Sequence, residues 1–457
     1  MTPALKANAN FRWLMSGGLL SLMGDQFTMV ALPWLVLKLS GDPLSLGLVL
    51  ALMGIPRAVF ILIGGALVDR YSPKQVMMLT KHASAVLLFV LAALTLGGHA
   101  SLPALYALAF GLGLSQAFSI PSGTSMLPRA IPAELLQAAN GTMMGLRQLT
   151  FLAGPLLAAL LLAFADDQRA LGLAFAFDCA SFVISAWTLS RVTPLPAAAP
   201  MSAPASSAAP IAPAAAATPA DAAAHNGAVR ATAAATPAAE TTAVAPTQGG
   251  AVRAVLRSVG DGLVMVWRDV ELRTCFAYWG LVSLLVGGVM QVALPVLAKD
   301  RLHDAAALGV LMAAHGGGTL LGMVASTTSS KLRLPRFGTM LLTVDALAGL
   351  ILFPLGAITA TWQGAALLLL LGALAGFMQV GVFTWIQRRV PPQAIGRTMS
   401  IFMFILFGLA PLSSAVTGWL LNQFTLQQLF AGGGAILLTC VAAAWTLTSM
   451  RRIEAAR

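Results

Sequence analysis

The sequence predicts an all-α polytopic membrane protein with twelve transmembrane helices in two parallel six-helix bundles. Of its 457 residues, 58% are hydrophobic and only 9% are charged, and the mean hydropathy is +0.84. A soluble domain has about 25% charged residues, so this chain lacks the polar surface that water requires. Apolar stretches of about 20 residues recur along the chain, each long enough to cross about 30 Å of hydrocarbon. A duplication, described below, relates the two halves.

The apolar stretches define the spans in order. The first is too long for the apolar region of a signal peptide and lacks a convincing cleavage site, so we expect it to be retained as a membrane span. The predicted spans are 13–37, 45–68, 76–97, 103–125, 138–163, 170–190, 273–297, 306–329, 338–358, 364–385, 398–420 and 428–449.

The net charge of +11 follows the predicted topology. With the N-terminus inside, the outer loops hold only four of the 27 basic residues: Lys38, Arg169, Lys299 and Arg301. The positive-inside rule therefore places both termini in the cytoplasm. We expect a multi-pass protein of the bacterial cell (inner) membrane, in contact with the lipid bilayer and with no nucleic-acid partner.

The composition divides the chain into three parts. Residues 1–193 form the predicted N-terminal six-helix bundle and residues 251–457 the C-terminal one. Between them, residues 194–250 are rich in Ala and Pro, contain no aromatic residue and include little bulky apolar surface. Such a segment cannot form a core, so it is predicted to be a disordered cytoplasmic linker.

A shift of 262 residues aligns the two halves. It pairs Val30–Pro33 with Val292–Pro295, Asp42 with Asp304, Gly47 with Gly309, and Gly54 with Gly316. A further echo matches "AGPL" at Ala153 with "LAPL" at Leu409. An even number of spans separates the halves, so they have the same orientation. A parallel repeat of this kind is typical of transporters whose two bundles rock about a site near the midplane.

The loop after the second span carries a recognisable motif. In "GGALVDRYSPKQV", Gly65, Asp69, Arg70 and Lys74 fit the loop pattern of the major facilitator superfamily, from which Ser72 and Pro73 depart. An Asp–Arg pair beside a helix end can lock two spans together and release them when they separate. Positive charge that holds a loop inside would explain Arg70 and Lys74, but not Asp69.

The fifth span, "GTMMGLRQLTFLAGPLLAA", resembles the superfamily's export motif at Gly141, Gly154 and Pro155. Ordinary helix packing also favours small residues at these positions. With "IPRAVFILIGGALVDR", "IPAELLQAANG", "DGLVMVWRDVELR" and "VPPQAIGRTMS", the chain resembles the branch that includes the enterobactin exporter and macrolide efflux proteins. The resemblance implies the major facilitator fold and proton-driven efflux of a small amphipathic or hydrophobic molecule. A lipid or lysophospholipid translocator, or an importer of the same fold, is the alternative.

Few charges lie deep in the spans, where they are costly. At about 1.5 Å per residue, Asp25 and Arg57 both lie about 18–20 Å from the inner end of their helices, so the two are geometrically able to pair. Three roles are open for Asp25. It forms a structural ion pair with Arg57, it carries a proton, or it binds a cationic substrate. Arg147 and Asp178 lie at comparable depth, where Arg147 either partners Asp178 or binds an anionic substrate.

The resemblance implies that spans one, seven and ten line the pathway. Gln26, Gln291 and Gln379 are therefore candidate cavity residues, with Met29 beside them as an adaptable apolar contact. His315 is either a packing residue or part of a proton relay.

The sequence argues against an enzyme and against a bound cofactor. No Lys follows a Gly, so the phosphate-binding GxxxxGK[ST] loop is absent, as is HExxH. Three cysteines in or beside separate spans have no metal-ligand spacing. We expect a monomer whose partners are a small-molecule substrate and protons.

Overall fold

The computed structural model describes residues 3–70, 72–164, 167–195, 260, 263–328, 336–391 and 394–454. The side chains of 60–70, 167, 327–328 and 396–397 lie outside this description. The predicted linker, 194–250, also lies outside it, apart from Pro194 and Leu195.

The N-terminal half consists of six long helices. After a short α1 (Pro3–Ala7), they are α2 (Ala9–Ser40), α3 (Pro43–Arg70), α4 (Pro73–Leu96), α5 (Leu102–Ala130), α6 (Leu136–Phe164) and α7 (Asp167–Ser190). A single 3-10 turn, η1 (Ala133–Leu135), precedes α6.

The C-terminal half follows the same plan with two interrupted spans. Its seventh span runs through α9 (Val270–Gly288), the π-helical η2 (Val289–Ala293), α10 (Leu294–Leu297) and the π-helical η3 (Ala298–Leu302). The rest comprises α11 (Ala305–Thr328), α12 (Phe337–Leu355), α13 (Thr361–Arg389), α14 (Ile395–Gly408), α15 (Ala410–Leu421), α16 (Leu426–Leu447) and the 3-10 turn η6 (Met450–Arg452). Helices α14 and α15 together form the predicted eleventh span.

Within the described residues, eleven helical segments are long and apolar enough to cross a membrane. The remaining predicted span, 45–68, corresponds to α3, whose described apolar part is Pro43–Val59. The all-helical polytopic fold class is confirmed.

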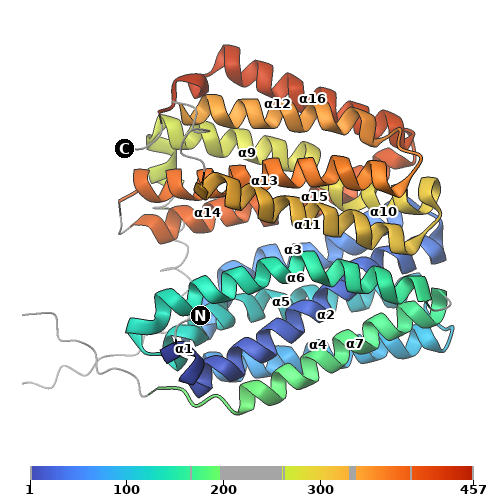
Figure 1. Ribbon diagram of the computed structural model, residues 1–457, viewed down its shortest axis with the longest axis vertical. Helices are drawn as coiled ribbons and strands as arrows, with labels where there is room; N and C mark the ends of the chain where they lie inside the picture. The colour runs from blue at the N-terminus through green and yellow to red at the C-terminus, as the bar shows by residue number, and fades with distance from the viewer. Residues whose placement is uncertain are drawn as a thin grey trace, which may run out of the picture.

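The two halves form separate bundles that lie side by side (Figure 1). The first and last helices begin and end at the same end of the molecule, where the N and C labels lie. Because α2 runs away from this end and α3 returns to it, the connection at Gly41 and Asp42 lies at the opposite face. In the predicted orientation that opposite face is the outer one.

Two helix crossings join the halves toward the outer face, and both are built on residues of the internal repeat. Gly47 of α3 lies against the Ser414 carbonyl and Gly418 of α15, and Gly54 lies against the Pro411 ring. A side chain at either glycine would collide with α15, so close approach of the two helices requires glycine there.

The second crossing repeats the first with the roles of the halves exchanged. Gly309 of α11 lies against the Pro155 carbonyl and Ala159 of α6, and Gly316 lies against the Phe151 carbonyl. Gly47 and Gly54 correspond to Gly309 and Gly316 in the repeat, as Pro155 corresponds to Pro411. We call these two contacts, α3 with α15 and α6 with α11, the outer crossings.

Two hydrogen bonds add to the outer closure. Asn422 Nδ2 donates to Asp42 Oδ1 over 2.9 Å, and Lys299 Nζ donates to the Leu37 carbonyl over 2.8 Å. Asp42 also caps α3, since its carboxylate accepts from the Leu44 and Ser45 amides. Its counterpart Asp304 caps α11 through the Ala306 amide.

The outer crossings yield a prediction about conformation. Replacing Gly54 or Gly316 with leucine forces the facing helix away and costs the closed outer face about 1–3 kcal/mol by overpacking. Spin labels at His99 and Trp362, in a background without the native cysteines, should then report longer distances between the halves. The matched control is Gly123→Leu, where an added side chain meets open space. Unchanged distances in both glycine variants would contradict a closure that depends on these contacts.

The Asp42 hydrogen bonds predict a pH dependence. Burial acts to raise the pKa of Asp42, but hydrogen bonds from Asn422, Leu44 and Ser45 outweigh it, so the pKa is lowered from 3.8. A lowered carboxyl pKa stabilises the fold above pH 3.8, and that stabilisation is lost as the pH falls through the folded-state value. Asp42→Asn should lower thermal stability by about 1 kcal/mol at pH 7.

The difference in free energy of unfolding between the parent and Asp42→Asn should shrink as the pH falls below about 4, because the parent's carboxylate then becomes neutral, like the amide of the variant. Asp304→Asn, which removes the charge of the equivalent capping residue of α11, serves as the control in the same thermal-unfolding series. If the stability difference between the parent and Asp42→Asn stays constant from pH 7 to pH 3, the charge of the Asp42 carboxylate is not the cause of that difference.

Candidate functional site

The deepest charges of the N-terminal half gather between α2, α4 and α7. Asp178 of α7 is 1% exposed, and its carboxylate accepts hydrogen bonds from Thr28 Oγ1 of α2 (2.5 Å) and from Ser181 Oγ (3.2 Å). Gly24 of α2 lies directly against Asp178 and Ser181. The two helices therefore meet closely enough to enclose a carboxylate within the bundle.

Lys81 joins this cluster from α4. Its side chain is 4% exposed, and Nζ donates to Ser185 Oγ (2.5 Å) and to Ser21 Oγ (3.5 Å). Nζ also lies 5.6 Å from the centre of the Phe182 ring. Sequence reasoning missed Lys81, since a lysine at this distance from the inner end of a span can also extend to the membrane surface.

Asp25 is half-buried one turn along α2 from Ser21. The charged groups that act on its carboxyl are Lys81, Arg147 and Asp178. The Asp25–Arg57 ion pair, one of the three alternatives for Asp25, is not formed in the described structure: the Arg57 guanidinium lies over the Phe407 ring of α14, 5.9 Å from its centre. The rise along the helices gave the right depth for both residues but could not show which way either side chain points.

The pairing of Arg147 with Asp178, one of the two alternatives for Arg147, is also absent from the described structure, where the Asp178 carboxylate accepts from hydroxyls. Arg147 is exposed, and its guanidinium lies 5.6 Å from the centre of the Phe151 ring on the same helix. It acts electrostatically on Asp25 instead. Asp345, in the other half, accepts a 2.7 Å hydrogen bond from the Tyr278 hydroxyl and so has a local partner.

The predicted cavity residues lie in different environments. Gln26 is 3% exposed and lies against Gly154 of α6, whereas Met29 is 46% exposed. Gln291 lies in the π-helical η2, where its side-chain carbonyl accepts from Ser414 Oγ over 3.0 Å. A π-helical turn within a span often marks a functional site.

The two remaining candidates lie on α11 and α13. Gln379 is exposed on α13. His315 is half-buried on α11 and hydrogen-bonds the Leu368 carbonyl of α13, and its Nδ1 is buried without a hydrogen-bond partner. These contacts agree with a packing role for His315.

The two sequence motifs lie partly within the described structure. Of the export motif, Gly154 contacts Gln26 of α2 and Pro155 contacts Gly309 of α11, while Gly141 faces open space. Of the gating loop, Lys74 donates to the Ser190 and Val192 carbonyls at the end of α7. The side chains of Gly65, Asp69 and Arg70 lie outside the described residues, so the gating role stays a prediction.

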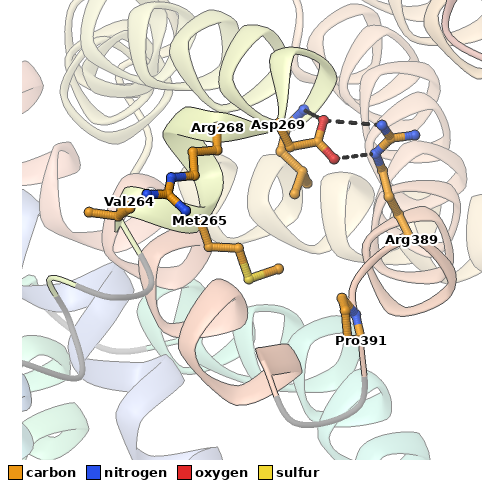
Figure 2. Close-up of a pocket in the computed structure, with 7 residues that line it drawn as sticks. Val264, Met265, Arg268, Asp269, Arg389 and Pro391 are labelled. Atoms are coloured by element: carbon orange, nitrogen blue, oxygen red, sulfur yellow. Dashed lines mark hydrogen bonds and ion pairs between the residues drawn. The ribbon is translucent and has the colours of Figure 1, made fainter.

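An ion-pair network at the inner face of the C-terminal half was not foreseen. Arg389 Nε and Nη2 donate to the two carboxylate oxygens of Asp269, over 2.9 and 3.1 Å (Figure 2). Arg389 Nη1 also pairs with Glu271. Burial acts to raise the pKa of Asp269, but these hydrogen bonds and those from the α9 amides lower it overall. Asp269 thereby caps α9 and ties it to the end of α13. The adjoining surface pocket contains none of the predicted transport residues.

The site has the chemistry of proton exchange and of electrostatic binding. Within the described residues, no group of three His, Cys, Asp or Glu side chains is placed to hold a metal ion. The buried carboxylates instead lie beside hydroxyls and one ammonium group, where they can gain or lose a proton.

Known proteins provide an independent comparison. The chain is 25% identical over 450 residues to the multidrug efflux pump Tap of Mycolicibacterium fortuitum, covering 95% of this chain and 94% of Tap. Among solved structures it resembles the nucleoside transporter NupG (TM-score 0.66, 13% identity, 96% and 99% coverage). It also resembles a bacterial homologue of the iron transporter ferroportin in an inward-facing state (TM-score 0.59, 18% identity, 95% and 96% coverage).

These structural likenesses are of the fold alone. The match to the family itself extends over residues 14–415 and spans both bundles. The chain is therefore a multi-pass secondary transporter and not an enzyme, and it belongs to the Major Facilitator Superfamily.

Proposed function

We propose that the chain exports a small amphipathic or hydrophobic molecule by proton antiport, through alternating access of the two bundles. The likeness to Tap along nearly the whole chain supports the direction of transport. The motif at Gly154 and Pro155 supports it further, since Gly154 lies against α2 and Pro155 lies in the crossing between α6 and α11. We place this activity in a bacterial inner membrane, with the chain acting as a monomer.

The observation that carries the coupling is the environment of Asp25. This carboxyl is half-buried at mid-depth, and no hydroxyl or amide within the described structure fixes it, in contrast to Asp178 and Asp345. The charged groups that act on it are Lys81, Arg147 and Asp178. A carboxyl with competing charged neighbours and no fixed hydrogen bond can change protonation when a substrate arrives or the bundles move.

The outer crossings support alternating access. They close the outer face in the conformation described, and Arg57 and Arg147 each lie one helical turn inward of a crossing. Arg57 and Arg147 thus lie at matching distances inward of the outer crossings, where a bound molecule would meet positive charge from the N-terminal half. Gln291 and Ser414 are the polar groups that the C-terminal half contributes at its π-helical turn.

The proposal predicts active efflux from cells. Bacteria that express the chain should accumulate less of at least one compound in a panel of amphipathic dyes and antibiotics than cells with an empty vector. A protonophore should remove the difference, because it collapses the gradient that drives antiport. Increased accumulation that depends on the gradient would indicate an importer and overturn the proposal.

Proton coupling is tested by Asp25→Asn. In proteoliposomes, this variant should lower substrate-induced proton flux by about tenfold or more, since an amide cannot exchange the proton. Asp345→Asn is the matched control, a deep aspartate in the other half that Tyr278 holds. The amount of each variant in the membrane is measured alongside. Intact proton flux in Asp25→Asn would exclude Asp25 as the carrier.

A further inference from the structure

A polar seam runs along the contact between α2 and α7. On α2, Gly17, Ser21, Gly24 and Thr28 recur at a spacing that places them on one helical face. Opposite them on α7 lie Asp178, Ser181, Ser185 and Thr188. A side chain at Gly17 or Gly24 would collide with Thr188, or with Asp178 and Ser181. The two glycines therefore let the helices enclose these polar groups within the bundle.

Lys81 enters this seam from α4 and does not extend to the membrane surface. It lies eight residues from the helix start at Pro73, about 12 Å at 1.5 Å per residue. Lys74, two turns nearer the inner end of α4, reaches backbone carbonyls there. Lys81 instead directs its ammonium between Ser21 and Ser185. The sequence distance from the helix end would have allowed either arrangement.

Burial of an ammonium group costs several kcal/mol unless an opposite charge compensates it. Two hydroxyls and the Phe182 ring provide hydrogen bonds and a weak cation–π contact, but no net charge. The carboxyl that acts on Lys81 is that of Asp25, one helical turn from Ser21 on α2. The Asp25 carboxylate therefore compensates the positive charge of Lys81, and Lys81 compensates the negative charge of Asp25.

The titratable groups that face one another here come from four helices. They are Asp25 on α2, Lys81 on α4, Arg147 on α6, and Asp178 and Cys179 on α7. Cys179 donates to the Ala85 carbonyl and contributes no charge as a thiol. Since Arg147 is exposed, Lys81 is the cation enclosed with the two carboxyls. One proton shared between Asp25 and Asp178 makes this enclosed group electrically neutral.

We propose that Lys81 is a positioning residue for proton coupling: held by Ser21 and Ser185, its ammonium is the fixed countercharge of the Asp25–Asp178 pair and sets the pH range over which that pair exchanges one proton. This inference rests on the proposed role of Asp25. When the Asp25 carboxyl releases its proton to water, Lys81 stabilises the carboxylate that forms. When the carboxyl regains a proton, the O–H bond re-forms and the ammonium keeps its hydrogen bonds to Ser21 and Ser185.

The test does not require the substrate to be known. Infrared difference spectra of the full-length protein in liposomes, recorded across a pH series, report the carbonyl band of protonated carboxyl groups. The band that Asp25→Asn removes belongs to the exchanging pair. In Lys81→Met, the midpoint of this band should move to higher pH by about one unit or more, because loss of a nearby cation favours the protonated carboxyl. Lys81→Arg should keep the midpoint near that of the parent.

Lys74→Met is the matched control, because it removes a lysine from the same helix outside the seam. If Lys81→Met does not reach the membrane, the double variant Ser21→Ala, Ser185→Ala keeps the charge but releases the ammonium, and a smaller shift in the same direction is expected. A midpoint equal to that of Lys74→Met would overturn the role of Lys81 and leave the role of Asp25 intact. The absence of any band that depends on Asp25 would overturn both.

Discussion

Close backbone contact between the halves at the two outer crossings is the constraint on which the rest of the structure depends. Gly47 and Gly54 admit α15 to the surface of α3, and Gly309 and Gly316 admit α6 to the surface of α11. Helices in lipid gain little from apolar burial against one another, so contacts of this kind rely on small residues and close packing. Since the repeat supplies equivalent glycines to both crossings, one geometric solution is used twice. The closed outer face and the pairing of helices across the halves follow from it.

The two halves share this scaffold but differ in their charges. The N-terminal half encloses Asp25, Asp178 and Lys81, whereas the position equivalent to Asp25 in the repeat is Gly287, which lies near Ser413 of α15. The deep carboxylate of the C-terminal half, Asp345, is bound to Tyr278. Among the described residues, the deep cluster of opposite charges thus lies within one bundle, and the seam between α2 and α7 would move with that bundle as a unit. This arrangement suits a transporter in which the protonation state changes inside one half while the contact between halves opens and closes.

Composition and periodicity predicted the fold well, because a chain with so few charges has few alternatives to a helical membrane bundle. The repeat predicted the equivalence of Gly47 with Gly309 and of Pro155 with Pro411, which the crossings bear out. The site was harder to predict. The number of residues from each helix end gave comparable depths for Asp25 and Arg57. It could not give the direction of either side chain, because each successive residue of an α-helix is rotated by about 100° about the helix axis. Lys81 was missed for a related reason, since its distance from the helix end suits both a surface lysine and a buried one.

The sequence by itself therefore determined the class of protein, the positions of the spans, the parallel repeat and the identity of the deep charges. Each of these depends on local composition or on spacing along the chain, which folding does not alter. Tertiary structure decided which charges meet. It placed the Arg57 guanidinium over the Phe407 ring of the other half and the Asp178 carboxylate within hydrogen-bond distance of Thr28. It also placed the Lys81 ammonium between Ser21 and Ser185. These partners are set by the rotation of each helix about its axis, and that rotation is fixed by the packing of glycines and prolines against neighbouring helices.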